Sequence, residues 1–167
     1  DQYMLNKSKI ALMGAFAAAA MVSTGAHAAT QTATAEVDII AAVQLTQDVG
    51  LDLGVAASSA TAGTVALNSG TGVRTCTGGV TCVGGAVRGQ FTVSGATATY
   101  VVGITVPAST TLTSGGNTMA LSLNPSMTSF TSTGASQIFY VGGVLSVAAN
   151  QAAGTYTGTY SVSADYQ

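Results

Sequence analysis

The sequence predicts an all-β protein that folds as an antiparallel β-sandwich. Apolar and polar residues alternate with a period of two through most of the chain, whereas a helical period is nearly absent. Gly, Ser, Thr and Asn separate these runs about every 8–12 residues, a spacing typical of sandwiches. Hydrophobic residues make up 47% of the chain, enough for a sizeable core. Charged residues make up only 6%, against roughly 25% in an ordinary domain, so self-association would meet little electrostatic resistance.

Residues 1–28 have the composition of a signal peptide for export. Two lysines lie within residues 7–9, residues 10–22 are apolar, and the small-x-small sequence AHA occupies residues 26–28. The alternative, a membrane anchor, needs about 20 apolar residues, more than this run provides. We therefore expect cleavage after Ala28, with residues 1–3 preceding the natural start at Met4. Residues 29–167 are then expected to form one sandwich domain.

Each expected strand rests on its own alternation or apolar run. Residues 32–46 alternate and then continue as an apolar strand to Leu45, and residues 49–55 place four apolar side chains on one face. Residues 63–70, 87–95, 98–107 and 117–125 are further strands, the last ended by Pro125. Residues 136–150 form a strand in which Gly142-Gly143 predicts a bulge or bend. Residues 153–167 show the cleanest alternation and are expected to form a strand with one face in the core.

Two cysteines, Cys76 and Cys82, are the only ones in the chain. In an exported protein, an isolated close pair predicts a structural disulfide. The Gly78-Gly79 pair between them suits a tight hairpin turn. The alternative of a redox-active pair is disfavoured because the spacing is not C-x-x-C, and a zinc site needs more ligands than the chain supplies.

The residues after the expected cleavage site argue against catalysis. They contain no His and no Lys, so the nucleophile–base pairs of hydrolases cannot be built. The acids Asp48 and Asp52 share one parity; we expect them to face solvent, with a carboxylate pair or a weak calcium site as alternatives. Arg74 and Arg88 are expected to be surface charges at strand edges. The four basic residues form no patch for nucleic acid. We therefore expect no enzyme activity, no cofactor and no metal.

The sequence also resembles a known family. Its LDLG (residues 51–54), its GGV (residues 78–80) and its GGVLSVAANQAAGTYTGTYSVSADYQ (residues 142–167) are similar to corresponding stretches of the DUF4402 domain of bacterial exported proteins. The match covers essentially the whole expected mature chain. Because the family is poorly characterised, it implies a β-sandwich fold and little about function.

A narrower resemblance links residues 154–167 to pilins that are assembled by the chaperone–usher route. Those pilins have an Ig-like fold and typically end in an alternating strand with a penultimate tyrosine and a glycine fourteen places from the end, positions held here by Tyr166 and Gly154. Such a strand pairs with a periplasmic chaperone and later borders a groove that the next subunit fills with a donated strand. The resemblance implies an acceptor edge formed by Gly154, Tyr156, Gly158, Tyr160, Val162, Ala164 and Tyr166. It also implies a donor strand with Ala33, Ala35, Val37 and Ile39 on one face.

These observations favour a non-enzymatic structural subunit of a surface filament. Its expected partners are copies of itself, a periplasmic chaperone and an usher, with no nucleic acid and no membrane span after cleavage. It would pass through the periplasm of a Gram-negative bacterium to the cell surface. The alternative is a secreted or surface Ig-like binding module that works as a monomer.

Overall fold

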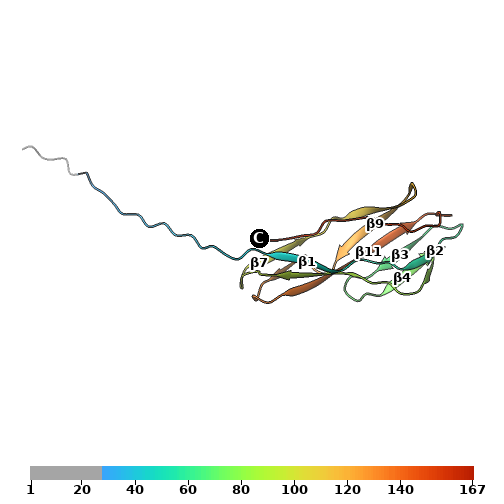
Figure 1. The fold of residues 1–167 in the computed structure, drawn as a ribbon, viewed down its shortest axis with the longest axis horizontal. Coiled ribbons are helices and arrows are strands. Elements are labelled where there is room, and N and C mark those ends of the chain that lie inside the picture. The colour runs from blue at the N-terminus through green and yellow to red at the C-terminus, as the bar shows by residue number, and fades with distance from the viewer. Residues whose placement is uncertain (1–27) are drawn as a thin grey trace, which may run out of the picture. The chain divides into compact units, whose positions relative to one another are not determined.

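The computed structural model describes residues 28–167 (Figure 1). The chain divides into two units, Asp1–Val37 and Asp38–Gln167, and the second contains all the strands. The described residues of the first unit, 28–37, carry no secondary structure. The predicted signal peptide lies outside the described residues, except for Ala28, and stays a prediction.

All regular secondary structure in residues 28–167 is β-strand, which confirms the predicted fold class. In chain order the strands are β1 (Gln44–Val49), β2 (Val55–Ala57), β3 (Gly63–Leu67), β4 (Arg74–Gly78), β5 (Thr81–Val83), β6 (Gly89–Ser94), β7 (Val101–Thr105), β8 (Ser109–Ser114), β9 (Asn117–Pro125), β10 (Ser129–Thr131), β11 (Gln137–Val147) and β12 (Ser163–Tyr166). The described region has no helix that could cross a membrane.

The strands form three antiparallel sheets. The largest has seven strands in the order β1-β6-β11-β3-β4, with β9 also paired to β11 and β8 to β9. A three-stranded sheet has the order β10-β7-β12, and β2 pairs with β5 in a two-stranded sheet. The predicted antiparallel sandwich is therefore confirmed.

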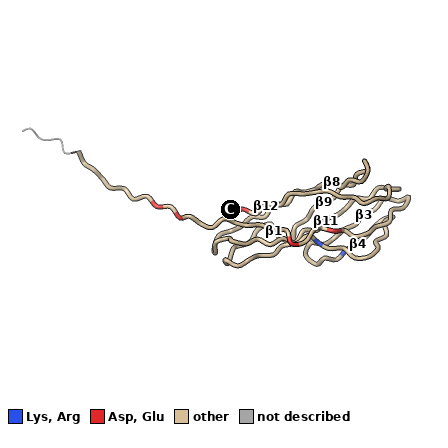
Figure 2. Tube along the Cα trace, in the orientation of Figure 1, with Lys and Arg blue, Asp and Glu red and all other residues tan. Residues whose placement is uncertain are grey.

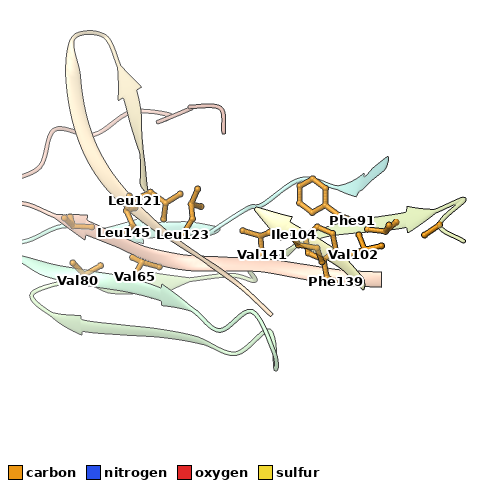
Figure 3. Packing of buried hydrophobic residues seen from close by; sticks show 13 residues of the cluster. Val65, Val80, Phe91, Val102, Ile104, Leu121, Leu123, Phe139, Val141 and Leu145 are labelled. Carbon is orange, nitrogen blue, oxygen red and sulfur yellow. The ribbon is translucent and has the colours of Figure 1, made fainter. Parts of the chain in front are cut away.

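The core lies between the sheets and follows the strand alternation (Figure 3). Phe139, Val141 and Val102 are each fully buried. The rings of Phe91 and Phe139 stack with their centroids 5.3 Å apart. Adjacent strands β6 and β11 thus contribute a stacked pair of aromatic rings to the core.

The long strand β11 runs through Gly142-Gly143 without the expected bulge. Its first half pairs with β6 and its second half with β3, while β9 pairs with its middle. A Cβ at Gly142 would collide with the carbonyl oxygen of Leu67. The glycines therefore allow close packing where β11 changes partner, and the predicted bulge is wrong.

Three other strand predictions are wrong in extent. Within residues 32–46, strand structure begins only at Gln44, and within residues 153–167 it is confined to Ser163–Tyr166. Residues 49–55 are divided between the end of β1 and the start of β2. Period-two alternation shows which side chains point the same way, but a β-ladder also needs a hydrogen-bonding partner, which these segments lack.

Charge is sparse along the trace (Figure 2). The described residues hold five acids and two arginines, namely Glu36, Asp38, Asp48, Asp52, Asp165, Arg74 and Arg88. Hydroxyl and amide groups therefore supply most of the polar surface of the domain.

Candidate functional site: a groove between two unpaired segments

Two segments far apart in the sequence each leave one backbone edge unpaired. We call residues 44–58 the first wall and residues 151–162 the second wall. In the first wall, β1 pairs only with β6 and β2 only with β5. The second wall forms a single bridge, between Thr157 and Thr113. Among the described residues, no backbone hydrogen bond joins the two walls, so a gap runs between them.

The LDLG stretch carries the first wall from one sheet to another. Asp52 and Val87 exchange two backbone hydrogen bonds of 2.8 and 2.7 Å, and the carboxylate of Asp52 accepts a bond from the Gly54 N–H at 2.8 Å. These bonds hold an irregular backbone in which Leu51 and Leu53 pack against the core. Val55 is 65% exposed, so the four apolar residues predicted to share one face do not share it.

Arg74 holds the LDLG stretch in place through hydrogen bonds to backbone carbonyls. Its guanidinium donates to the carbonyl oxygen of Leu53 at 2.9 Å and to the carbonyls of residues 83–85. Gly54 has a φ of +75°, and a Cβ there would collide with the Arg74 Nη1. Arg74 does lie on an edge strand, β4, as the sequence predicted, but its side chain is a half-buried cross-link between loops.

The second wall lies against β8. Thr113 and Thr157 exchange backbone hydrogen bonds of 2.8 and 3.0 Å, and the Thr110 hydroxyl donates to the Thr159 carbonyl oxygen at 2.7 Å. A Cβ at Gly154 would collide with Ser114, and one at Gly158 with β8 backbone. The glycines of this alternating segment thus let the wall approach β8 closely.

Both ends of the gap are closed by hydrogen bonds. At one end, the Ser58 hydroxyl donates to the Gln151 carbonyl oxygen at 3.0 Å, and the Asn150 N–H donates to the Ser59 carbonyl oxygen at 2.7 Å. At the other end, the Tyr166 hydroxyl donates to the Ala41 carbonyl oxygen at 2.8 Å. The gap is therefore a bounded groove between the walls.

Two adjoining cavities occupy the groove. The smaller, of about 420 Å³, lies between residues 45–51 and 158–162, above Phe91. The larger, of about 910 Å³, lies between residues 51–58 and 151–158. Its apolar floor consists of Leu112, Met119, Leu121, Leu145 and Val147. An open channel with an apolar floor and unpaired edges on both sides offers what an inserted β-strand needs.

Tyr160 lies where the two cavities meet and lines both. Its ring packs edge-on against Phe91, with centroids 6.4 Å apart. Its hydroxyl is buried without a hydrogen-bond partner among the described residues. Burial raises the pKa of this phenol above its ordinary value, because the charged form would lose its hydration.

The four predicted donor residues lie in a segment without secondary structure. Ala33 and Ala35 are exposed, Val37 is 78% exposed and Ile39 is 88% exposed. Burying large apolar side chains that are exposed to this extent would be favourable, because it removes apolar surface from water. The structure describes them as unpaired, and their role as donors stays a prediction.

The residues of the predicted acceptor edge lie in the second wall and in β12. Burial alternates as expected: Tyr156, Tyr160, Val162, Ala164 and Tyr166 are half-buried, and the threonines and serines between them are exposed. Gly154 and Gly158 are exposed. Only β12 pairs with a neighbour along its length, the strand β7. Whether this edge accepts a chaperone or a donated strand stays a prediction.

The predicted disulfide is confirmed. Cys76 of β4 and Cys82 of β5 are joined, with their Cα atoms 5.9 Å apart. The expected hairpin between them is wrong, because β4 pairs with β3 while β5 pairs with β2. Since Ala56 of β2 is opposite Cys82, the disulfide ties the first wall to the seven-stranded sheet.

Asp48 and Asp52 are both exposed, as predicted. Asp48 accepts a hydrogen bond from the Thr92 hydroxyl at 2.6 Å, and Asp52 is engaged with Gly54. In residues 28–167 no three metal-ligating side chains lie together. Arg88 stacks on the ring of Tyr140, 3.5 Å from its centroid, and donates to the carbonyl oxygen of Ser69 at 2.8 Å. These polar groups are engaged in local structure.

The model of the domain of unknown function DUF4402 matches residues 43–166. The chain belongs to the DUF4402 family. The match begins next to β1 and covers both walls of the groove, so the groove lies inside the family domain. No curated protein and no solved structure matches the chain.

Sequence reasoning missed the floor of the groove. Leu112 lies in β8, a strand of alternating threonines that was not predicted, and Leu145 lies in β11. Their apolar character was visible, but only the long-range pairing of β8, β9 and β11 brings them together. The LDLG stretch and the alternation of the second wall were the two signals that the sequence did contain.

Proposed function

We propose that this DUF4402 protein is an exported structural subunit of a bacterial surface filament. In this proposal, the segment before β1 in one copy docks as a β-strand in the groove of the next copy. The observation that carries it is complementarity within one chain: an apolar groove with unpaired edges, and an exposed alternating segment without a partner.

The pattern of the donor segment fits the groove. With Val37 and Ile39 facing the floor, Glu36 and Asp38 fall on the opposite parity and face solvent. Burying Val37 and Ile39, now largely exposed, would contribute roughly 1.5–3 kcal/mol each. Main-chain hydrogen bonds to the open edges would add affinity independent of sequence.

Side-chain size favours one orientation of the docked strand. The large cavity suits Val37 and Ile39, whereas Ala33 and Ala35 suit the small one. The docked strand then runs parallel to the first wall and antiparallel to the second. A segment that folded back from its own β1 would form a hairpin and run antiparallel to the first wall. The favoured orientation is therefore one that a second copy supplies.

Export and partners follow from the same groove. An open apolar channel would promote aggregation before assembly. We propose that a periplasmic chaperone covers it in transit, and that an usher exchanges the chaperone for the next subunit at the outer membrane. The predicted signal peptide and the resemblance to chaperone–usher pilins, including an Ig-like fold, support this route. The absence of His and Lys after residue 28 supports a non-enzymatic role.

The experiment that tests the proposal compares two charge insertions in the full chain. Protein sheared from cells is run on SDS gels without and with boiling, and is viewed by negative-stain microscopy. Ile39→Asp puts a charge on the face that docks, and is expected to abolish multimers while export continues. Thr34→Asp puts the same charge on the opposite face, and should keep a ladder that collapses on boiling. Monomers of the unaltered chain, without fibres, would instead favour a monomeric binding module.

A further inference from the structure

Three residues form a closed hydrogen-bonded triangle at the start of the domain. The Tyr166 hydroxyl accepts a bond from the Thr97 N–H at 2.7 Å and donates one to the Ala41 carbonyl oxygen at 2.8 Å. The Ala41 N–H donates to the Thr97 hydroxyl at 3.1 Å. Both backbone polar groups of Ala41 are therefore engaged, and the chain direction at this residue is fixed.

Neighbouring contacts strengthen this attachment. The ring of Tyr166 packs against the core and, edge-on, against Tyr100, with centroids 5.8 Å apart. A Cβ at Gly95 would come within 2.9 Å of the Ala42 carbonyl oxygen, so Ala42 lies directly against the turn that follows β6. Ala41 and Ala42 lie outside any β-ladder, and the hydrogen bonds of Ala41 together with the close approach of Ala42 to Gly95 fix the course of the chain there.

The position of this attachment limits where the chain can reverse. The groove begins at Leu45, and the donor segment immediately precedes Ala41. A donor side chain on the floor must lie opposite a core-facing residue of β1 such as Leu45, which pairs with the buried Val93. A three-residue turn gives this register. With residues 41–42 held, such a hairpin must turn at residues 38–40, which places Ala33 opposite Leu45, Ile39 in the turn and Val37 beyond the groove. A hairpin that turned at residues 41–43 would place Ile39 opposite Leu45 and carry Val37 into the groove.

We propose that Tyr166 and Thr97 form a clamp that keeps each donor segment out of its own groove. The clamp withholds both large apolar side chains from self-docking, so that the groove stays open for a second copy. This inference rests on the proposed function, because it assumes that the groove accepts residues of the donor segment. Tyr166 acts here as a positioning residue through Ala41 and does not itself line either cavity.

The test measures binding of a fluorescent peptide, residues 30–42 of this chain, to dilute full-chain monomers. Tyr166→Phe keeps the ring and removes both hydrogen bonds of the hydroxyl. Without these bonds, the chain's own donor segment can enter the groove and compete with the peptide. Peptide binding is therefore expected to weaken about tenfold, which corresponds to roughly 1.4 kcal/mol. Adding Ile39→Asp disables the chain's own donor, so the double variant should bind as tightly as the unaltered protein. Tyr100→Phe, which keeps the clamp, should leave binding unchanged.

Each outcome decides between the two claims. Unaltered binding by Tyr166→Phe, or weak binding that Ile39→Asp does not restore, overturns the clamp. Failure of the peptide to bind the Ile39→Asp chain, whose clamp and groove are both intact, overturns docking itself and with it the proposed function. If Tyr166→Phe does not fold, Thr97→Val removes the hydroxyl that accepts from Ala41 and must give the same restorable loss.

Discussion

Replacing Tyr160 by Phe is expected to stabilise the free monomer, although a polar contact is usually lost in such a change. The Tyr160 hydroxyl is buried and has no partner among the described residues. Tyr156 provides a matched contrast in the same wall. Its hydroxyl donates to the Ala152 carbonyl oxygen at 2.8 Å and accepts from the Gln151 side chain at 2.8 Å.

The size of the expected stabilisation follows from the burial of the Tyr160 hydroxyl without a hydrogen-bond partner. Burying a polar group without a hydrogen bond costs roughly 1–3 kcal/mol. The ring of Phe fills the same space, so no cavity opens. We expect the free energy of unfolding to rise by about 1 kcal/mol, or the Tm by about 4 °C for a domain of this size. Tyr156→Phe should lower the free energy of unfolding by about 1 kcal/mol.

The assay is urea unfolding followed by circular dichroism. It is run on chains that also carry Ile39→Asp, because assembly would otherwise add to the apparent stability. A Tyr160→Phe variant less stable than its parent by more than about 0.5 kcal/mol would refute the reasoning, since the hydroxyl must then have a favourable partner.

Three further predictions test the groove and its supports. Gly89→Ala places a Cβ within 2.9 Å of the Tyr160 hydroxyl and should lower the Tm, and adding Tyr160→Phe should recover most of the loss, as melting curves of the double variant will show. Alkaline pH should destabilise the domain, because the pKa of Tyr160 is higher in the folded state than in the unfolded state. The contribution of Tyr160 to the free energy of unfolding is fully present below about pH 10 and is lost as pH rises through the folded pKa. Unfolding curves between about pH 9 and 12 should show a smaller loss of stability for Tyr160→Phe. Arg74→Met removes the donors that hold the Leu53 carbonyl and should lower the free energy of unfolding in urea by about 3 kcal/mol, whereas Asp165→Asn, at an exposed position of β12, should change it little. Equal losses in the last pair would contradict the bracing role of Arg74.

The fold class was predictable because its signals are local. Alternation and turn residues identified most strands, and the disulfide followed from an isolated pair in an exported context. Pairing was not predictable, since it depends on which edges meet. Residues 155–162 alternate as cleanly as β12, yet they form only one bridge, at Thr157.

The groove could be anticipated only in outline. The alternating segments at residues 33–39 and 154–166 suggested a donor and an acceptor edge; the structure describes residues 33–39 without pairing, and in residues 154–162 a single bridge before β12 begins. The floor at Leu112 and the buried hydroxyl of Tyr160 depend on long-range packing. The clamp at Ala41 joins residues 125 positions apart, a contact for which local sequence carries no signal.

Cross-linking between two different chains tests strand donation most directly. One chain carries Val37→Cys and the other Leu112→Cys, and the two are mixed and oxidised; the native cysteines are already joined to each other. We predict a disulfide-linked pair of the two chains, and none when Thr34→Cys, on the opposite face, replaces Val37→Cys. Equal cross-linking from both positions, or none from either, would contradict the docking of this segment in the groove of a second copy.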